Sequence, residues 1–140
     1  MKTLQKNRLV VKSNALIEAS YKLTLQEARI ILLLSSMINK DDDDFKLYQI
    51  KVKDFADFIG VNKNKNLYRE LSEITTKLRK RSILIKKEES LLEIGWLSSA
   101  EYFFNKGFVE LEFSDKLKPY LLQLKERFTK YHLDSVLKLK

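Results

Sequence analysis

The residues of this chain with the clearest capacity for chemistry lie between positions 62 and 87. This segment holds nine Lys and Arg residues against two acidic ones, a balance of +7. An apolar stripe recurs in it at spacings of four, three and four residues, which predicts a helix over about 65–81: Leu67, Leu71, Ile74 and Leu78. The opposite face consists of Lys65, Arg69, Ser72, Glu73, Thr76, Arg79 and Lys80. Clustered cations of this kind suit phosphate groups, because they release the counterions that phosphates condense.

The preceding segment predicts how this helix is positioned. A short amphipathic helix is expected over residues 52–59, with an inward face of Val52, Phe55, Ala56 and Ile59. Gly60 suits the left-handed position that ends such a helix, and a polar turn then leads to the basic helix. The two helices together have the pattern of a helix-turn-helix.

Two alternating segments follow the basic helix and predict β-hairpins. The first covers residues 82–97 and turns near 87–90, and the second covers residues 100–113, with Gly107 able to supply a positive φ in its turn. Helix, turn, helix and then β-hairpins is the order of a winged helix, whose second helix is presented to a DNA groove. We therefore predict an α+β winged helix with its N-terminal helices packed on the sheet.

The remaining segments complete this architecture. Thr24 and Glu27 have the spacing of a capping box, so a buried central helix is expected to begin there, and a strand is expected over residues 45–52. Further elements are expected toward the C-terminus: a helix from Ser114 or Asp115, a strand over 127–133 and the start of a last helix. We divide the chain into a flexible arm (1–12), a winged-helix domain (13–135) and the start of a linker or helix to a second domain (136–140).

The composition argues against enzymatic chemistry. The 140 residues include no cysteine and a single histidine, His132, which leaves no thiolate metal site and no Cys–His catalytic pair. Three glycines cannot build a phosphate-binding loop, and the run of four aspartates at 41–44 lacks the glycine of a calcium loop. We expect no enzyme activity, no metal and no cofactor.

Charge and hydropathy indicate an acidic partner. The net charge of +8 and the isoelectric point near 9.5 favour nucleic acid first and an anionic membrane second. The N-terminus lacks the pattern of a signal peptide, and the apolar run at 30–34 is far shorter than the roughly 20 residues that span a bilayer. We expect a cytoplasmic protein without a membrane partner. Residues 88–115 carry seven acids against one lysine, so this segment is expected to repel nucleic acid although the whole chain is basic.

Aromatic residues crowd the predicted hairpins. Both faces of a strand cannot be core at once, and Tyr102 and Phe104 point one way while Phe103 points the other. Stacking on single-stranded bases is opposed by the acidic balance of the segment. Burial against the helices, with an exposed apolar patch that pairs with another subunit, is the preferred interpretation.

Three separated stretches, at 10–34, 48–61 and 109–131, resemble the N-terminal domain of plasmid replication initiators, the Rep family that binds iterons. The resemblance covers essentially residues 9–140 and includes SNAL, LTLQEARI and LKPYLLQLK followed by FTKY. It implies a non-catalytic protein with two winged-helix domains that opens the plasmid origin with host initiation proteins. The first domain contributes phosphate contacts and holds a repressor dimer together. This chain is then expected to be an isolated first domain.

The resemblance also implies roles for particular residues. Contacts to the DNA backbone fall on Lys65, Arg69, Thr76, Arg79 and Lys80, assisted by Lys86 and Lys87 in the first hairpin. Contacts in a homodimer fall on Ile94, Trp96, Tyr102 and Phe104. Two alternatives remain open: a module that only dimerises, and a winged-helix transcriptional regulator unrelated to replication.

Overall fold

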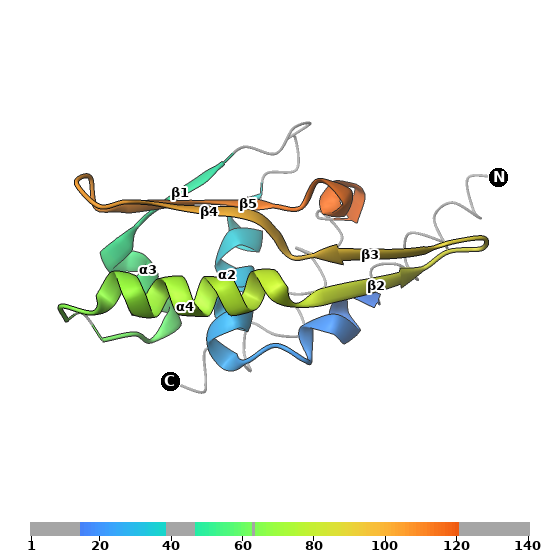
Figure 1. The fold of residues 1–140 in the computed structure, drawn as a ribbon, viewed down its shortest axis with the longest axis horizontal. Coiled ribbons are helices and arrows are strands. Elements are labelled where there is room, and N and C mark those ends of the chain that lie inside the picture. Colours follow the sequence, from blue (N-terminus) through green and yellow to red (C-terminus); the bar gives the residue numbers. More distant parts are fainter. Residues whose placement is uncertain (1–14, 39–46, 63, 121–140) are drawn as a thin grey trace.

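The computed structural model of this protein describes residues 15–38, 47–62 and 64–120 (Figure 1). The predicted N-terminal arm and all elements expected after residue 120 lie outside these ranges. The described elements follow in this order: a helical segment at 15–20, α2 (Leu25–Ser36), β1 (Tyr48–Lys51), α3 (Val52–Ile59), α4 (Leu67–Lys80), β2 (Ser82–Lys86), β3 (Leu91–Gly95), β4 (Leu97–Phe103), β5 (Phe108–Phe113) and the 3₁₀ helix η1 (Asp115–Tyr120).

Helix α2 is the buried central helix that the sequence predicts. Thr24 Oγ1 accepts the backbone N–H of Glu27 at 3.2 Å, and Glu27 Oε1 accepts the N–H of Thr24 at 3.0 Å, which confirms the capping box. Ile30, Ile31 and Leu34 are fully buried. A helix that is apolar on most sides has to be surrounded, and both α3 and α4 pack against it.

Three strands form an antiparallel sheet in the order β1-β5-β4. Alternate residues of these strands point inward and are buried, among them Tyr48, Ile50, Val109, Leu111 and Phe113. Helices α2, α3 and α4 lie on one side of this sheet (Figure 1). The apolar face of the sheet is thereby covered, while Glu110 and Glu112 are on its outer face.

Strands β2 and β3 form a separate two-stranded ribbon instead of continuing the sheet. The predicted turn is confirmed, since the N–H of Lys87 donates to the carbonyl of Ser90 at 2.8 Å. The alternating pattern did not indicate this separation. The ribbon and the sheet separate at Trp96, which lies between β3 and β4. The Trp96 side chain is in the core and 1% exposed. The ribbon continues the direction of α4 and extends beyond the three-stranded sheet (Figure 1).

The base of the ribbon lies against the last turn of α4, and this close approach requires Gly95. A Cβ at this position would lie 3.0 Å from the backbone oxygen of Arg79. Ser114 Oγ donates to the carbonyl of Gly95 at 2.6 Å, and the N–H of Ser114 donates to the carbonyl of Trp96 at 3.2 Å. These contacts fix the ribbon between the end of α4 and the end of β5.

The other predicted elements differ from the structure mainly in length. Helix α3 has the predicted bounds and the four predicted buried residues, and Gly60 ends it with φ of 83°. Strand β1 is shorter than expected, because Val52 already begins α3, and residues 45 and 46 lie outside the described ranges. The helix expected near Ser114 is the 3₁₀ helix η1 as far as the description extends.

Candidate nucleic-acid interface

Backbone and side-chain hydrogen bonds build the turn between α3 and α4. The N–H groups of Gly60 and Val61 both donate to the carbonyl of Ala56 at 2.9 Å, which closes the end of α3. Asn64 Oδ1 then accepts the N–H of Asn66 at 2.8 Å, just before α4 begins. The N–H of Asn64 also donates to the carbonyl of Asn62 at 3.1 Å, so hydrogen bonds connect the end of α3 with the start of α4, as a helix-turn-helix requires.

Helix α4 packs one face on the core. Leu71 and Leu78 are fully buried and Leu67 and Ile74 are half-buried, so the predicted apolar stripe is confirmed. The sequence pattern missed Thr75, which is also buried. Its hydroxyl hydrogen bonds to the carbonyl of Ser72 and to the hydroxyl of Tyr102, both at 3.1 Å. A buried hydroxyl needs such partners, and they come from tertiary packing that local periodicity does not contain.

The solvent-facing surface of α4 divides into two flanks of different charge. At 3.6 residues per turn, one flank consists of Arg69, Ser72, Thr76, Arg79 and Lys80. The other consists of Glu70, Glu73, Ile74 and Lys77. The first flank has three cations and no acid, whereas the second has two acids and one cation. Glu73, which the sequence pattern placed on the basic face, lies at the border of the two flanks and contacts Arg69. Phosphate is therefore favoured on the first, basic flank.

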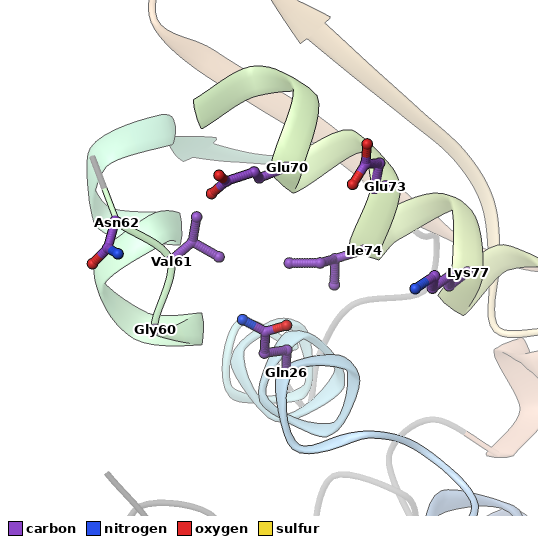
Figure 2. A pocket seen from close by; sticks show the side chains of 8 residues that line it. All are labelled: Gln26, Gly60, Val61, Asn62, Glu70, Glu73, Ile74 and Lys77. Atoms are coloured by element: carbon purple, nitrogen blue, oxygen red, sulfur yellow. The ribbon is translucent and has the colours of Figure 1, made fainter. Parts of the chain in front are cut away.

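A groove of about 340 Å³ runs along the second, acidic flank, between α4, the N-terminal part of α2 and the α3–α4 turn (Figure 2). It is lined by Gln26, Gly60, Val61, Asn62, Glu70, Glu73, Ile74 and Lys77. Figure 2 shows Gln26 and Ile74 pointing toward its middle, with Glu70 toward Asn62 and Lys77 at the other end. Two carboxylates in this groove would repel phosphate, which also favours the basic flank for DNA.

The seven residues that the resemblance assigns to DNA are all exposed in the structure. They lie on the turn, α4, β2 and the first residue after β2, and we call them the basic row: Lys65, Arg69, Thr76, Arg79, Lys80, Lys86 and Lys87. Because α4 leads directly into β2 and the two elements run on in one direction (Figure 1), these positions are spread along the length of both elements. The fourteen residues of α4 span about 21 Å and the five of β2 about 16 Å, so the row is roughly as long as one turn of duplex DNA, about 34 Å.

Two arginines of the basic segment are engaged with carboxylates. Arg69 Nε lies 3.9 Å from Glu73 Oε1, and both side chains are exposed, so this ion pair is weak. Arg81 is turned inward, and its Nε donates to Glu27 Oε1 at 3.0 Å. Arg81 is therefore not part of the basic row, although the charge count of the sequence includes it.

The four residues assigned to a dimer interface do not share one surface. Trp96 is in the core, and Ile94 lies opposite Ile83 on the inner face of the ribbon. Tyr102 is half-buried against α4, and only Phe104, in the β4–β5 loop, is 70% exposed. Strand β3 and the β4–β5 loop lie toward opposite ends of α4 (Figure 1).

Tyr102 is the one titratable group of the described residues with a clearly altered pKa. Desolvation raises the pKa of Tyr102 to about 12, and the hydrogen bond with Thr75 partly offsets this effect. The Tyr102 ring also meets Tyr68 of α4 edge to face, with centroids 6.2 Å apart. At neutral pH this tyrosine is an uncharged link between α4 and β4.

The described residues lack two further features. No group of three or more His, Cys, Asp or Glu side chains there is placed to hold a metal ion. No helix in the same part of the chain has the length and apolar character needed to cross a bilayer.

Comparison with solved structures defines the fold class. The WH1 domain of MSBI1.176, a replication protein isolated from a multiple sclerosis patient, is 28% identical with a TM-score of 0.57, over 88% of this chain and 97% of that one. The Pi initiator protein in complex with iteron DNA has a TM-score of 0.54 at 18% identity, over 76% of this chain and 46% of that one, and this likeness shows the fold alone. The fold is that of a winged-helix domain, as the sequence predicts.

A family comparison makes the assignment more specific. The family model described as initiator replication protein, WH1, matches residues 9–140, and the chain belongs to this family. A replication initiation protein of Escherichia coli is 29% identical over 91% of this chain, and a 27.6 kDa uncharacterized protein of the same organism is 27% identical over 94%. The chain spans 41% and 61% of the lengths of these two relatives. The resemblance identified from the sequence is confirmed.

Proposed function

We propose that this replication-initiator WH1 domain binds duplex DNA of a plasmid origin, chiefly through its phosphates, with the basic row as the contact surface. The observation that carries the proposal is that exposed cations occur along α4 and again at the far end of β2, the strand that continues the direction of α4 (Figure 1). Family membership supports an origin as the target, and the Pi initiator of similar fold is bound to iteron DNA. In this proposal the domain contributes binding and no catalytic step.

The charge on α4 has a simpler explanation that has to be weighed. Lys77, Arg79 and Lys80 are in the last turn of α4, where cations stabilise a helix through its dipole. That explanation does not extend to Lys86 and Lys87, because they lie beyond the helix on the ribbon. Nor does it explain why three of the four cations of α4 lie on one flank. Contact with phosphate accounts for both features.

The two flanks of α4 provide a matched test. Arg79→Gln removes a charge from the basic flank, and Lys77→Gln removes one from the acidic flank two residues away. If phosphates lie along the basic row, Arg79→Gln makes the negative slope of log K against log salt less steep by about one, and Lys77→Gln leaves the slope unchanged. Titrations of a labelled duplex at several salt concentrations measure both slopes. Equal effects of the two variants would mean that only the net charge matters.

The ribbon favours a second function, self-association. In the described structure β2 and β3 pair only with each other, so each has an open edge that can accept a strand from another copy. Leu84 and Leu91 are also exposed on the outward face of this ribbon. Sedimentation equilibrium is expected to show a dimer that the double variant Leu84→Ser, Leu91→Ser weakens. A wild-type chain that stays monomeric at all concentrations would exclude this function.

A further inference from the structure

The groove along the acidic flank of α4 takes no part in the proposed contact with DNA. At 3.6 residues per turn, Glu70, Ile74 and Lys77 lie on one side of the helix, and Arg79 lies on the other side, within the basic flank. The groove is bounded by the N-terminal part of α2 and by the α3–α4 turn (Figure 2). A molecule bound in it would therefore leave the cations of the basic flank open.

The middle of this groove is apolar. Val61 and Ile74 line it and are both half-buried, so each keeps part of its apolar surface in contact with water. Figure 2 shows Ile74 pointing into the groove from α4 and Gln26 from α2. Its volume of about 340 Å³ is in the range of pockets that bind ligands. An aliphatic side chain placed against Ile74 would remove this apolar surface from water.

Polar side chains surround the apolar middle and differ between the two ends of the groove. Glu70 lies with Asn62 at one end, and Lys77 lies at the other (Figure 2). Within the part of the chain that the structure describes, the side chains of Gln26, Asn62, Glu70 and Lys77 form no hydrogen bond or ion pair. Seven positions of α4 separate Glu70 from Lys77, or about 10 Å, which about three residues of extended peptide span.

The stability of α4 alone explains part of this arrangement. Glu70 is in the first turn of α4 and Lys77 in the last, where their charges stabilise the helix through its dipole. The dipole does not account for Glu73, which lies in the middle of the helix, nor for an apolar groove between these charges. Glu73 has only the weak, exposed ion pair with Arg69. Two carboxylates on one wall of the groove favour a cation there.

We infer that this groove is a docking site for a short extended segment of a partner protein, one that carries Lys or Arg next to an aliphatic residue. The cation pairs with Glu70 and Glu73, the aliphatic side chain covers Ile74, and the amide of Gln26 hydrogen bonds to the backbone of the segment. Lys77 meets an oxygen atom at the other end. Because the groove and the basic flank lie on different sides of α4, the partner binds while the domain is on DNA.

Selection from a displayed library of random heptapeptides tests this inference. The wild-type chain is expected to enrich peptides in which Lys or Arg is adjacent to Leu, Ile or Val. The enriched peptide is then labelled, and its affinity is measured by fluorescence anisotropy. Glu70→Gln and Glu73→Gln should each weaken binding about tenfold, because each removes a charged acceptor. Glu101→Gln removes the same charge from the outer face of the sheet and, as the control, should leave the affinity unchanged.

The other outcomes overturn the inference. Equal weakening in all three glutamate variants would mean that only net charge attracts the peptide. Enriched peptides without a cation, or no enrichment at all, would refute a docking site of this chemistry. Displacement of the peptide by a duplex would place it on the surface that binds DNA, and displacement by excess unlabelled chain unable to bind the peptide itself would assign the groove to a second copy.

The docking site and the proposed function fail separately. A chain that binds the enriched peptide but no duplex would refute the contact with DNA and leave the docking site standing. A chain that binds the duplex, with a less steep salt slope in Arg79→Gln, but enriches no peptide would refute the docking site alone. All three glutamate variants change exposed or half-buried side chains, and thermal unfolding checks that each remains folded.

Discussion

Arg81 donates from Nε to Oε1 of Glu27 across 3.0 Å, and this contact joins the end of α4 to the start of α2. The Glu27 side chain is 1% exposed and the Arg81 side chain 38%. The same carboxylate oxygen accepts the N–H of Thr24. A buried carboxylate needs its charge balanced. The position of Arg81, the residue between α4 and the ribbon, is therefore held by its contact with Glu27 of α2.

Removal of Arg81 is therefore expected to destabilise the fold. Arg81→Ala removes the cation that contacts the buried Glu27 carboxylate in the described structure, and the free energy of unfolding should fall by about 2 kcal/mol. This is less than for a fully buried pair, because water reaches Arg81. Urea unfolding measures the change, with Arg79→Ala as the control on the exposed flank, where about 0.5 kcal/mol or less is expected. Equal losses in the two variants would contradict a special role for the pair.

Two glycines with positive φ provide a second prediction. Gly60 has φ of 83°, and a Cβ there would lie 2.9 Å from Nη1 of the buried Arg29. Gly107 has φ of 71° and nothing within 4 Å of such a Cβ. Gly107→Ala should cost about 1 kcal/mol from backbone strain alone, and Gly60→Ala about 2–3 kcal/mol because a crowded side chain also has to move. Thermal unfolding of both variants decides the order, and a larger loss for Gly107→Ala would refute it.

The raised pKa of Tyr102 predicts a loss of stability at alkaline pH. The unfolded chain deprotonates this tyrosine near pH 10, whereas the folded chain retains the proton to about pH 12. The unfolded state thus binds fewer protons in this window, so the contribution of Tyr102 to stability is constant below about pH 10 and then falls, by at most about 1.4 kcal/mol per pH unit. Urea titrations of the wild type and Tyr102→Phe should diverge only in this window. Parallel curves would mean that Tyr102 ionises equally in both states.

Burial of Trp96 and exposure of Phe104 lead to opposite expectations for the two aromatic residues. Trp96→Ala should lower the free energy of unfolding by about 3–5 kcal/mol, because it creates a cavity in the core. Phe104→Ala should cost less than about 1 kcal/mol, since only the contact with Tyr68 is lost. Chemical unfolding measures both, and a stable Trp96→Ala chain with altered self-association would place Trp96 at an interface after all.

Local signals account for the parts of the fold that were predicted well. Helix α3 is fixed by its apolar spacing and by Gly60, both of which are contained within nine residues of sequence. The alternation of Val109, Leu111 and Phe113 likewise marks β5 and its buried face. Alternation does not specify which strands pair, so the division into a sheet and a ribbon could not be predicted. That division depends on Trp96 and Gly95 meeting groups far away in the sequence.

Only part of the candidate site could be predicted from the sequence, because the rest depends on contacts between distant segments. The basic row follows one continuous segment, and counting charges along the chain finds it. By contrast, the sheet register brings Lys51 opposite Phe108, close to the hairpin that holds Lys106, although the two lysines are far apart in the sequence. Charge counting also included Arg81, whose inward direction depends on Glu27, 54 residues away. Electrostatic surfaces are assembled by tertiary structure, and segment totals describe them poorly.

The ribbon is a separate two-stranded sheet, so its length can differ without a change in the rest of the domain. In the described structure β2 and β3 are hydrogen-bonded to each other and to no strand of the three-stranded sheet. Their length can therefore change without disturbing the register of that sheet. Adding two residues to each strand would move Lys86 and Lys87 outward by about 7 Å and keep Ile83 and Ile85 facing the core. An odd insertion would reverse the two faces of the added segment. Relatives whose ribbons differ in length are therefore expected to differ by an even number of residues in each strand. The length of the ribbon would determine how far along a duplex the domain extends.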